Sequence, residues 1–255
     1  AARADPSLAP GILKTARLGY DGKGQVRVAA AAEVAAAYAR MGGAPCVLER
    51  YVDLACEVSV IVARDDSGAA VTWPLAENRH RDGILDVSIA PARVDPALAR
   101  AAREVAIGVA NALDYRGVLC VEMFVSRAGE LTVNEMAPRP HNSGHYTIDA
   151  CATSQFEQQA RVLAGLPLGD TVQHTPAVMV NLLGDLWFLK DAQHSHEPDW
   201  AQLLAVPDLK LHLYGKRHAR HGRKMGHFTV VDADPQRARE LAMAARAAIG
   251  IVDAP

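Results

Sequence analysis

The chain has 255 residues, of which 50% are hydrophobic and 22% are charged, and its formal net charge is −2. This composition suits a globular protein with a sizeable core, and the small net charge excludes bulk attraction to nucleic acid or to an anionic membrane. Four widely spaced cysteines without a Cys-x-x-Cys pair predict reduced thiols in a cytoplasmic protein. No apolar run is long enough to span a bilayer, so we expect no membrane partner.

In the first half of the chain, strand signals dominate. Strands are predicted at 11–15, 25–29, 45–51, 56–63 and 69–75, the last two as a hairpin. A short alanine-rich helix is predicted at 31–41, where two glycines end it. Asp95 and Pro96 predict the start of a long helix that runs to about residue 113, because Asp is a good N-cap and Pro fits the first turn.

The second half begins with a predicted hairpin of strands at 117–125 and 130–135. A helix is predicted from about residue 147 to 163, and a last helix at 234–249. Between them, strands are predicted at 177–183, 210–214 and 226–231. Because hairpins favour antiparallel or mixed sheets, the pattern predicts an α+β fold with two sheets.

The loop at 18–26 carries three glycines within six positions, together with Lys23. Such a backbone can present successive N–H groups to a phosphate. Lys14 lies nine residues before Lys23 in a strand-like stretch, a common position for a lysine that holds a nucleotide triphosphate. The loop also suits an ordinary hairpin turn. Its spacing matches neither a P-loop nor a dinucleotide fingerprint.

Two glutamates occupy the hairpin that follows the long helix. If Ala128 and Gly129 form its tip, Arg127 faces Glu130, and the same register places Glu122 directly opposite Glu135. Directly opposed side chains have Cβ atoms roughly 5 Å apart, where like charges repel.

A divalent cation would relieve this repulsion, and Mg²⁺ typically takes one or two carboxylates together with substrate phosphates. The neighbouring Asn134 can add a neutral oxygen. The alternative is two exposed glutamates on an edge hairpin. Both strands are otherwise strongly apolar, so we expect the carboxylates to be internal and favour metal binding.

Lys14, the glycine loop and the carboxylate pair together resemble the ATP-grasp superfamily. Within it, three motifs resemble the 5-(carboxyamino)imidazole ribonucleotide synthase family, the ATP-dependent carboxylases of purine biosynthesis. These motifs are GYDGKGQ at 19–25, ENRHRDGIL at 77–85 and NEMAPRPHNSGH at 134–145. The resemblance covers essentially the whole chain.

The resemblance implies an ATP site, residue by residue. Lys14 and the loop would hold the phosphates, the backbone at 49–52 would read the adenine edge, and Glu57 would accept the ribose hydroxyls. The implied ATP-binding residues are Lys14, Gly19, Tyr20, Asp21, Gly22, Lys23, Gly24, Gln25, Glu49, Arg50, Tyr51, Val52, Glu57, His80, Asn134 and Glu135. The implied Mg²⁺ ligands are Glu122 and Glu135.

The resemblance also implies a side that binds bicarbonate and 5-aminoimidazole ribonucleotide. Its implied residues are Tyr20, Asp21, Lys23, Arg139, His141, Asn142, Ser143, Lys216 and Arg223. The implied catalytic residues are Asp21, Lys23, Arg139 and His141. Among these, Asp21 and His141 are the expected proton carriers.

A basic segment at 216–224 holds five fixed positive charges. It suits a solvated loop or a phosphate pocket better than a nucleic-acid surface, because stacking aromatic residues are absent. The resemblance favours the phosphate pocket, in which Lys216 and Arg223 would bind the 5′-phosphate of the ribonucleotide. We expect the remaining charges of this segment to be solvated.

The resemblance implies an ATP-grasp domain at 1–165, with a lid subdomain at about 1–50, and a small β-rich C-terminal domain at 166–255 that binds the substrate phosphate. The family normally carries an N-terminal Rossmann-like domain of about a hundred residues before the first lysine strand. That domain is missing from this sequence, so we expect a fragment that binds its ligands weakly or is inactive alone. A homodimer is also expected from the family.

The predicted activity is carboxylation of 5-aminoimidazole ribonucleotide with ATP and bicarbonate, through carboxyphosphate. One alternative is another ATP-grasp ligase that forms an acyl phosphate on a different acceptor. The other is a catalytically silent nucleotide-binding module.

Overall fold

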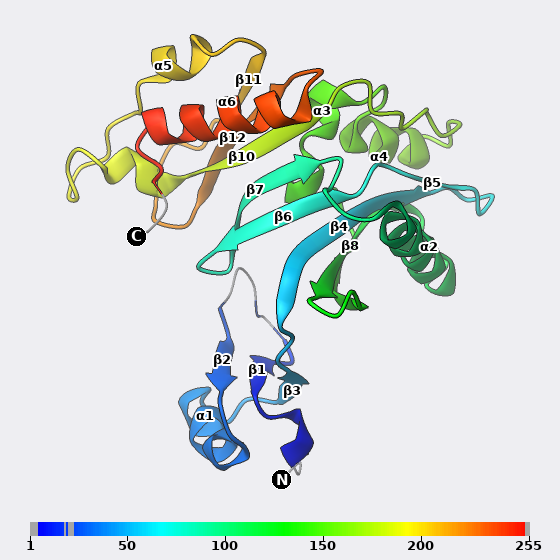
Figure 1. The fold of residues 1–255 in the computed structure, drawn as a ribbon, viewed down its shortest axis with the longest axis vertical. Coiled ribbons are helices and arrows are strands. Elements are labelled where there is room, and N and C mark those ends of the chain that lie inside the picture. Colours follow the sequence, from blue (N-terminus) through cyan, green and yellow to red (C-terminus); the bar gives the residue numbers. More distant parts are fainter. Residues whose placement is uncertain (1–4, 18, 20–22, 253–255) are drawn as a thin grey trace.

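The computed structural model describes residues 5–17, 19 and 23–252. The chain forms two sheets, one of three strands and one of nine (Figure 1). All strand pairs within them are antiparallel in the described residues. The predicted α+β fold with two sheets is therefore confirmed.

The small sheet lies at one end of the molecule, with the order β2-β1-β3 (Figure 1). Its elements are the 3-10 helix η1 (Pro6–Leu8), β1 (Gly11–Thr15), β2 (Gln25–Val28), η2 (Ala31–Glu33), α1 (Val34–Arg40) and β3 (Cys46–Arg50). A core of Leu13, Val28 and Ala37 joins α1 to the sheet. This subdomain holds the lysine strand and both ends of the glycine loop.

The large sheet has the order β11-β12-β10-β7-β6-β4-β8-β9, and β5 pairs with β4. Its strands are β4 (Leu54–Arg64), β5 (Ala70–Thr72), β6 (Ala76–Arg81), β7 (Ile84–Ala90), β8 (Gly117–Ser126), β9 (Leu131–Ala137), β10 (Ala177–Leu183), β11 (Leu209–Leu213) and β12 (Lys224–Val231). Strands β6 and β7 were not predicted. The sequence of β6 is mostly polar and charged, so it lacks the apolar alternation that marks a strand.

The helices are α2 (Pro96–Ala112), η3 (Asn142–Gly144), α3 (Thr147–Ala150), α4 (Gln155–Leu163), η4 (Gly184–Phe188), α5 (Trp200–Leu204) and α6 (Pro235–Ala248). Asp95 caps α2 as predicted, because its carboxylate accepts a hydrogen bond from the Ala97 N–H at 2.7 Å. The single helix predicted at 147–163 is instead α3 and α4. The break falls at Cys151, which forms an isolated bridge with Gln173, and Ser154 caps α4.

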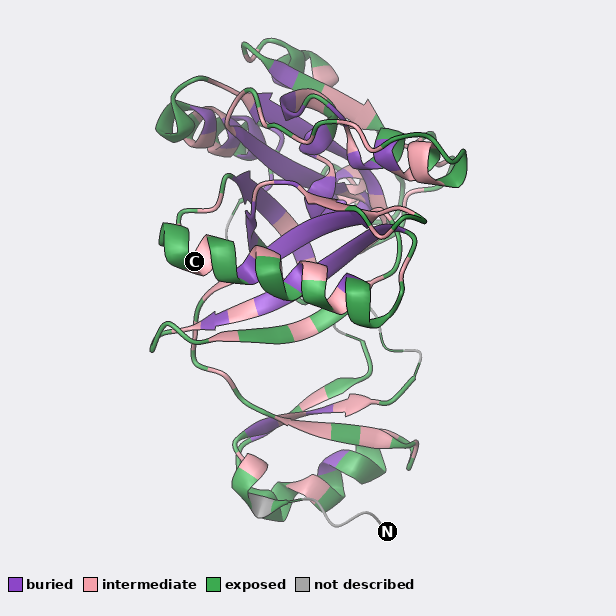
Figure 2. Cartoon of the chain, turned by 90° about the vertical axis from the view of Figure 1, so that its right-hand side faces the viewer, coloured by how far each residue is buried: buried purple, intermediate pink, exposed green. Residues whose placement is uncertain are grey.

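Both faces of the large sheet are covered (Figure 2). Val58, Glu77, Ile89 and Val178 are paired across β4, β6, β7 and β10 and therefore share one face. Helices α2 and α6 pack on this face. The opposite face packs against Ala150 of α3 and the adjoining Tyr146 and Cys151. Figure 2 shows the resulting layer of buried strands.

The sheet is continuous across the predicted domain boundary at residue 165, because β10 pairs with β7. The division into domains at 1–165 and 166–255 stays a prediction. Within the described ranges, no helix combines the length and the apolar character required to cross a membrane.

A buried ion pair attaches α6 to the large sheet. Arg246 is 4% exposed, and its guanidinium donates to Asp86 of β7 at 2.6 Å and to the carbonyl of Ile251 at 3.1 Å. Removing one partner of a buried pair leaves an uncompensated charge.

We therefore predict that Arg246→Met lowers the free energy of unfolding by about 3–5 kcal/mol in urea titrations. The control is Arg237→Met on the same helix, which removes an exposed ion pair with Asp232. The control should cost less than about 1 kcal/mol. Equal losses in the two variants would show that the Arg246 pair does not hold α6 in place.

Candidate functional site

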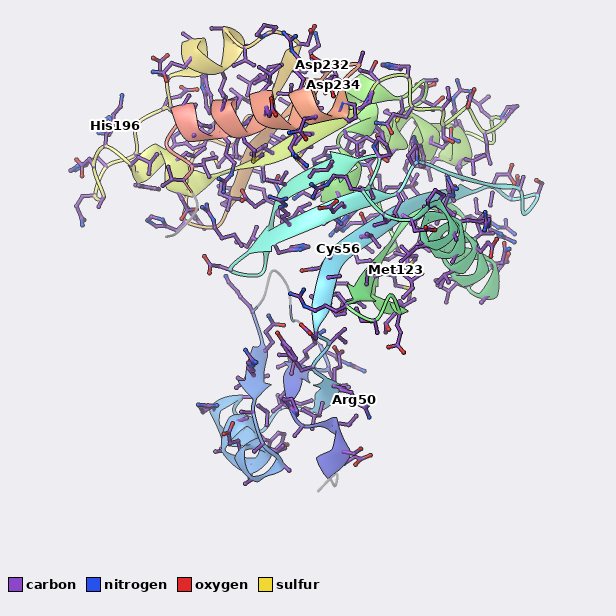
Figure 3. All side chains as sticks on the ribbon, in the orientation of Figure 1. Arg50, Cys56, Met123, His196, Asp232 and Asp234 are labelled. Atoms are coloured by element: carbon purple, nitrogen blue, oxygen red, sulfur yellow. The ribbon has the colours of Figure 1, made fainter. Side chains whose placement is uncertain are left out.

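A cavity of about 700 Å³ lies between the small sheet and the large sheet. It is lined by these predicted site residues: Lys14, Gly19, Lys23, Gly24, Gln25, Glu49, Arg50, Tyr51, Val52, Glu57, His80, Glu122, Asn134, Glu135, Arg139, His141 and Asn142. Figure 3 shows Arg50 on the small sheet, below Cys56 and Met123 of the large one. Tyr20, Asp21 and Gly22, also predicted here, lie outside the described residues.

Lys14 connects the two sides of this cavity. It projects from β1, where its Nζ lies 2.5 Å from Glu49 Oε2 of the neighbouring β3. The same Nζ donates to Asn134 Oδ1 of β9 in the large sheet, at 3.3 Å. A positive charge therefore faces the carboxylate pair from across the cavity.

Glu122 and Glu135 are direct partners on β8 and β9, as predicted. The predicted turn, however, is wrong by one residue. The Ser126 N–H donates to the Glu130 carbonyl at 2.9 Å, so Ser126 faces Glu130 where Arg127 was expected to do so. A bulge corrects the offset: Glu122 pairs with Glu135 but Met123 pairs with Val133, which leaves Asn134 as the extra residue.

The two carboxylates differ in burial. Glu122 is 7% exposed, whereas Glu135 is exposed on the edge strand β9. The expectation that both are internal is therefore wrong for Glu135. The apolar composition of β9 did not predict burial, because two of its apolar side chains, those of Val133 and Met136, are also exposed.

Two histidines flank Glu122. His141 Nε2 lies 3.0 Å from Glu122 Oε1. His80 Nδ1 lies 3.0 Å from Glu57 Oε2, and its Nε2 is 4.0 Å from Glu122 Oε2. Glu57 and His80 were predicted as nucleotide contacts, and the structure adds that His80 lies between Glu57 and Glu122.

The pKa values of the carboxyl groups show an unequal pair. Burial acts to raise the pKa of Glu122, but the hydrogen bond from His141 and the charges of His141, His80 and Lys224 lower it overall. Burial and the charge of Glu122 raise the pKa of Glu135. Burial acts to lower the pKa of His80, but the hydrogen bond and charge of Glu57, with Glu122 and Glu135, raise it.

Asn142 lies in the cavity wall and is 7% exposed. Neither polar atom of its side-chain amide has a hydrogen-bond partner in the part of the chain that the structure describes. A buried amide without partners is costly, and at a cavity it suits a ligand contact. Its neighbour Ser143 is fully buried and is absent from the cavity lining, so it lies behind the wall.

The basic segment at 216–224 is only partly placed at this cavity. Lys224 lines it, but Lys216 and Arg223 do not. The Lys216 ammonium donates to the Lys224 carbonyl, and the Arg223 guanidinium donates to the His218 carbonyl at 2.6 Å. Burial and the charges of Arg223 and Lys224 lower the pKa of Lys216.

Several lining residues were missed by the sequence analysis. Lys224 was expected to be solvated, and the apolar Ile12, Leu54 and Phe124 were not assigned to the site. Strand alternation offers a signal for two of them, because Ile12 and Phe124 lie two residues from Lys14 and Glu122 and share their faces. Lys224 is the first residue of β12, so no such alternation was available for it.

A second cluster of titratable groups lies outside the cavity. The rings of His145, His227 and His212 are stacked, with centroids 4.6 and 4.5 Å apart. His212 Nε2 is 2.8 Å from Asp149 Oδ2, and the Tyr214 hydroxyl is 2.9 Å from His227 Nδ1. Burial, together with neighbouring positive charges, lowers the pKa of His145 to about 3 and that of His227 to about 2.

Comparison with protein families matches residues 5–156 to the ATP-grasp domain. The chain belongs to the ATP-grasp family. Residues 177–241 match the phosphoribosylaminoimidazole carboxylase C-terminal domain.

Among curated proteins, the chain is 52% identical to an N5-carboxyaminoimidazole ribonucleotide synthase of Brucella melitensis, over 86% of this chain and 58% of that protein. It is 47% identical to the Bacillus subtilis protein of the same name, over 86% of this chain and 56% of that protein. The chain thus spans less than two thirds of the length of these relatives. The predicted resemblance to this synthase family is confirmed.

Solved structures from this synthase family have a similar fold. An N5-carboxyaminoimidazole ribonucleotide synthetase in complex with ADP has a TM-score of 0.83 at 44% identity, covering 93% of this chain and 60% of that one. An Aspergillus clavatus N5-carboxyaminoimidazole synthase, in complex with ADP and 5-aminoimidazole ribonucleotide, has a TM-score of 0.82 at 30% identity. The match to the Aspergillus structure covers 94% of this chain and 62% of that chain.

The histidine stack generates a prediction on pH. His145 and His227 have folded pKa values far below the unfolded value of about 6.5, so below pH 6.5 the unfolded state binds more protons. Stability is therefore lost as the pH falls. Between pH 7 and 5 we expect a loss on the order of 2 kcal/mol per histidine, measured by urea unfolding.

His145→Gln should reduce this difference between pH 7 and pH 5. His194→Gln is the matched control, since the His194 side chain is 77% exposed, and it should leave the difference unchanged. If His145→Gln and wild type lose equal stability on acidification, the stack is not the source of the pH dependence.

Proposed function

We propose that the complete protein carboxylates 5-aminoimidazole ribonucleotide to its N5-carboxyamino product, using ATP and bicarbonate. The observation that carries this proposal is the opposed Glu122–Glu135 pair at a cavity that Lys14 and the glycine loop also line. The names of the relatives, and the ADP and 5-aminoimidazole ribonucleotide in their structures, support it.

ATP would occupy the side of the cavity next to the small sheet. Lys14, Gly19, Lys23 and Gly24 line this side and would bind the phosphates. Gly24 has a φ of 74°, a backbone conformation that glycine adopts without strain. The backbone at 49–52 would contact the adenine edge. Ile12, Leu54 and Phe124 offer an apolar surface for the base, and Glu57 an acceptor for the ribose hydroxyls.

The carboxylate pair fits a divalent cation. Its oxygen donors suit Mg²⁺, and burial, with the charge of Glu122, raises the pKa of Glu135, as is expected where two carboxylates lie close together. Glu122 and Glu135 would hold the ion. When bound, Mg²⁺ would supply positive charge to the phosphate oxygens during transfer.

The acceptor side would be formed by Arg139, His141, Asn142 and Lys224. A bicarbonate oxygen would attack the γ-phosphorus of ATP, and the bond to ADP would break, which gives carboxyphosphate. Carboxyphosphate would release CO₂ and phosphate, and the exocyclic amine of the ribonucleotide would capture the CO₂. The unpartnered Asn142 amide suits a contact to the carboxyl group or to the ribonucleotide.

Lys216 and Arg223 are proposed to bind the 5′-phosphate. They stand on the segment that ends at Lys224, a cavity residue, which supports a substrate that extends from the cavity toward this segment. Catalytic roles for Asp21 and Lys23, bicarbonate as a substrate, a homodimer and a cytoplasmic location stay predictions from the resemblance.

Two other functions are distinguished by simple assays. Another ATP-grasp ligase would release ADP with a different acceptor, so a panel of acceptors separates it from the proposed enzyme. A silent nucleotide-binding module would bind ATP and Mg²⁺ in calorimetry and show no turnover with any acceptor.

We predict that Glu135→Ala abolishes bicarbonate-dependent ADP formation in the complete protein, because a single carboxylate remains at the metal position. A coupled assay with 5-aminoimidazole ribonucleotide measures the loss. Glu130→Ala in the exposed turn of the same hairpin is the control and should keep wild-type turnover. Near-normal turnover of Glu135→Ala would remove the metal assignment.

A further inference from the structure

A row of buried polar side chains crosses the large sheet behind the cavity. Ser88 of β7, Asn78 of β6 and Ser59 of β4 are 0%, 4% and 1% exposed, and all three lie on the face that carries Glu122. The row lies beside an apolar core on this face that includes Ile61, Cys120 and Met179. Buried polar groups in such surroundings are costly unless each is hydrogen-bonded.

The row forms a continuous chain of hydrogen bonds that ends at the cavity. Ser88 Oγ donates to Asn78 Oδ1 at 2.8 Å, and Asn78 Nδ2 donates to Ser59 Oγ at 2.9 Å. Ser59 Oγ then donates to Ser143 Oγ at 2.7 Å. Ser143 Oγ lies 2.9 Å from His141 Nδ1, and His141 Nε2 lies 3.0 Å from Glu122 Oε1. We call Ser88, Asn78, Ser59 and Ser143 the polar row.

The direction of the last two bonds follows from the donors. The backbone N–H of Ser143 also points to His141 Nδ1, at 3.3 Å, so this nitrogen must be an acceptor. Since Ser59 donates to Ser143, the Ser143 hydroxyl keeps its own proton for His141 Nδ1. Two donors thus converge on Nδ1, and the ring proton of neutral His141 is left on Nε2, facing Glu122.

The backbone of His141 is fixed as firmly as its ring. The fully buried amide of Gln155 accepts from the His141 N–H at 2.8 Å and donates to the His141 carbonyl at 2.7 Å. Gly144 allows this amide to approach, because a Cβ at residue 144 would lie 2.5 Å from Gln155 Oε1. The position and the rotation of His141 are both specified by buried groups.

We propose that Ser143 is a positioning residue, which holds His141 with Nδ1 as acceptor and Nε2–H as donor toward Glu122 and the cavity. This inference rests on the proposed carboxylation. It assigns His141 to that reaction as a hydrogen-bond donor that orients Glu122, and it removes His141 from the set of general bases. It also gives Ser143 a role behind the cavity wall, where a substrate contact was expected.

The first test reads the tautomer of His141 without using the reaction. In the complete protein with ¹⁵N-labelled histidine, the resonances of His141 are assigned by their loss in His141→Gln. Wild type should show a protonated Nε2 and an unprotonated Nδ1. Ser143→Ala should populate the other tautomer, whereas Ser67→Ala, in an exposed turn, should leave the spectrum unchanged.

The second test is a double-mutant cycle on turnover. Ser143→Ala should lower kcat about tenfold, the size expected for loss of one oriented hydrogen bond at a reacting site, with little change in the KM for ATP. In the His141→Gln background, the same substitution should cost less than about twofold, because the residue through which Ser143 acts is gone. Ser59→Ala, one bond further back, should change the tautomer and kcat in the same direction, and serves if Ser143→Ala does not fold.

The outcomes separate the two proposals. A wild-type Nδ1 that carries the proton, an unchanged His141 spectrum in a folded Ser143→Ala variant, or equal losses of kcat in both backgrounds would each overturn the role of Ser143. Absence of bicarbonate-dependent ADP formation by wild type with 5-aminoimidazole ribonucleotide would instead overturn the proposed function. The tautomer measurement would then still decide the positioning of His141.

Discussion

The site of this protein depends on the electrostatic repulsion between two carboxylates on neighbouring strands. Glu122 and Glu135 face each other across β8 and β9, and Glu122 is almost fully removed from water. Such a pair is unfavourable unless positive charge is brought to it. His80 supplies part of this charge on the large sheet, where His141 Nε2 also lies within hydrogen-bond distance of Glu122, and Lys14 supplies part from β1 of the small sheet. Both sheets therefore contribute groups that compensate the charge of the same carboxylate pair.

Most of the side chains that surround Glu122 and meet this requirement are largely removed from solvent. The carboxylate pair, the polar row and the loop at η3 all belong to one face of the large sheet, while α2 and α6 complete the opposite face with apolar side chains. One face therefore packs mainly through apolar side chains, and the other carries buried polar groups, of which the polar row is hydrogen-bonded. At the cavity, neither polar atom of the Asn142 amide has a hydrogen-bond partner among the described residues.

Much of this arrangement could be predicted from local sequence. The opposed glutamates, the capped helix α2 and the lysine strand follow from turn residues, caps and alternation, which act over a few positions. The turn itself was wrong by one residue, and the bulge at Asn134 restored the pairing that matters. A bulge of this kind depends on how both strands pair, so no local rule could find it.

The remaining misses share a tertiary cause. Strand β6 is polar in sequence but is held in the sheet by partners such as Ser59 and Ser88, which are distant in the chain. The break between α3 and α4 follows from the bridge of Cys151 with Gln173. The resemblance implied a substrate contact for Ser143, and only the packing of η3 shows that its hydroxyl points to Ser59 and His141.

The central claim is that Glu122 and Glu135 together hold a divalent cation. Anomalous diffraction at the manganese edge, from crystals of the complete protein grown with Mn²⁺ and ADP, tests it most directly. The account predicts one peak within direct coordination distance, about 2 Å, of an oxygen from each carboxylate. An anomalous peak elsewhere in the cavity would contradict it. So would the absence of any peak, with the two carboxylates turned away from each other.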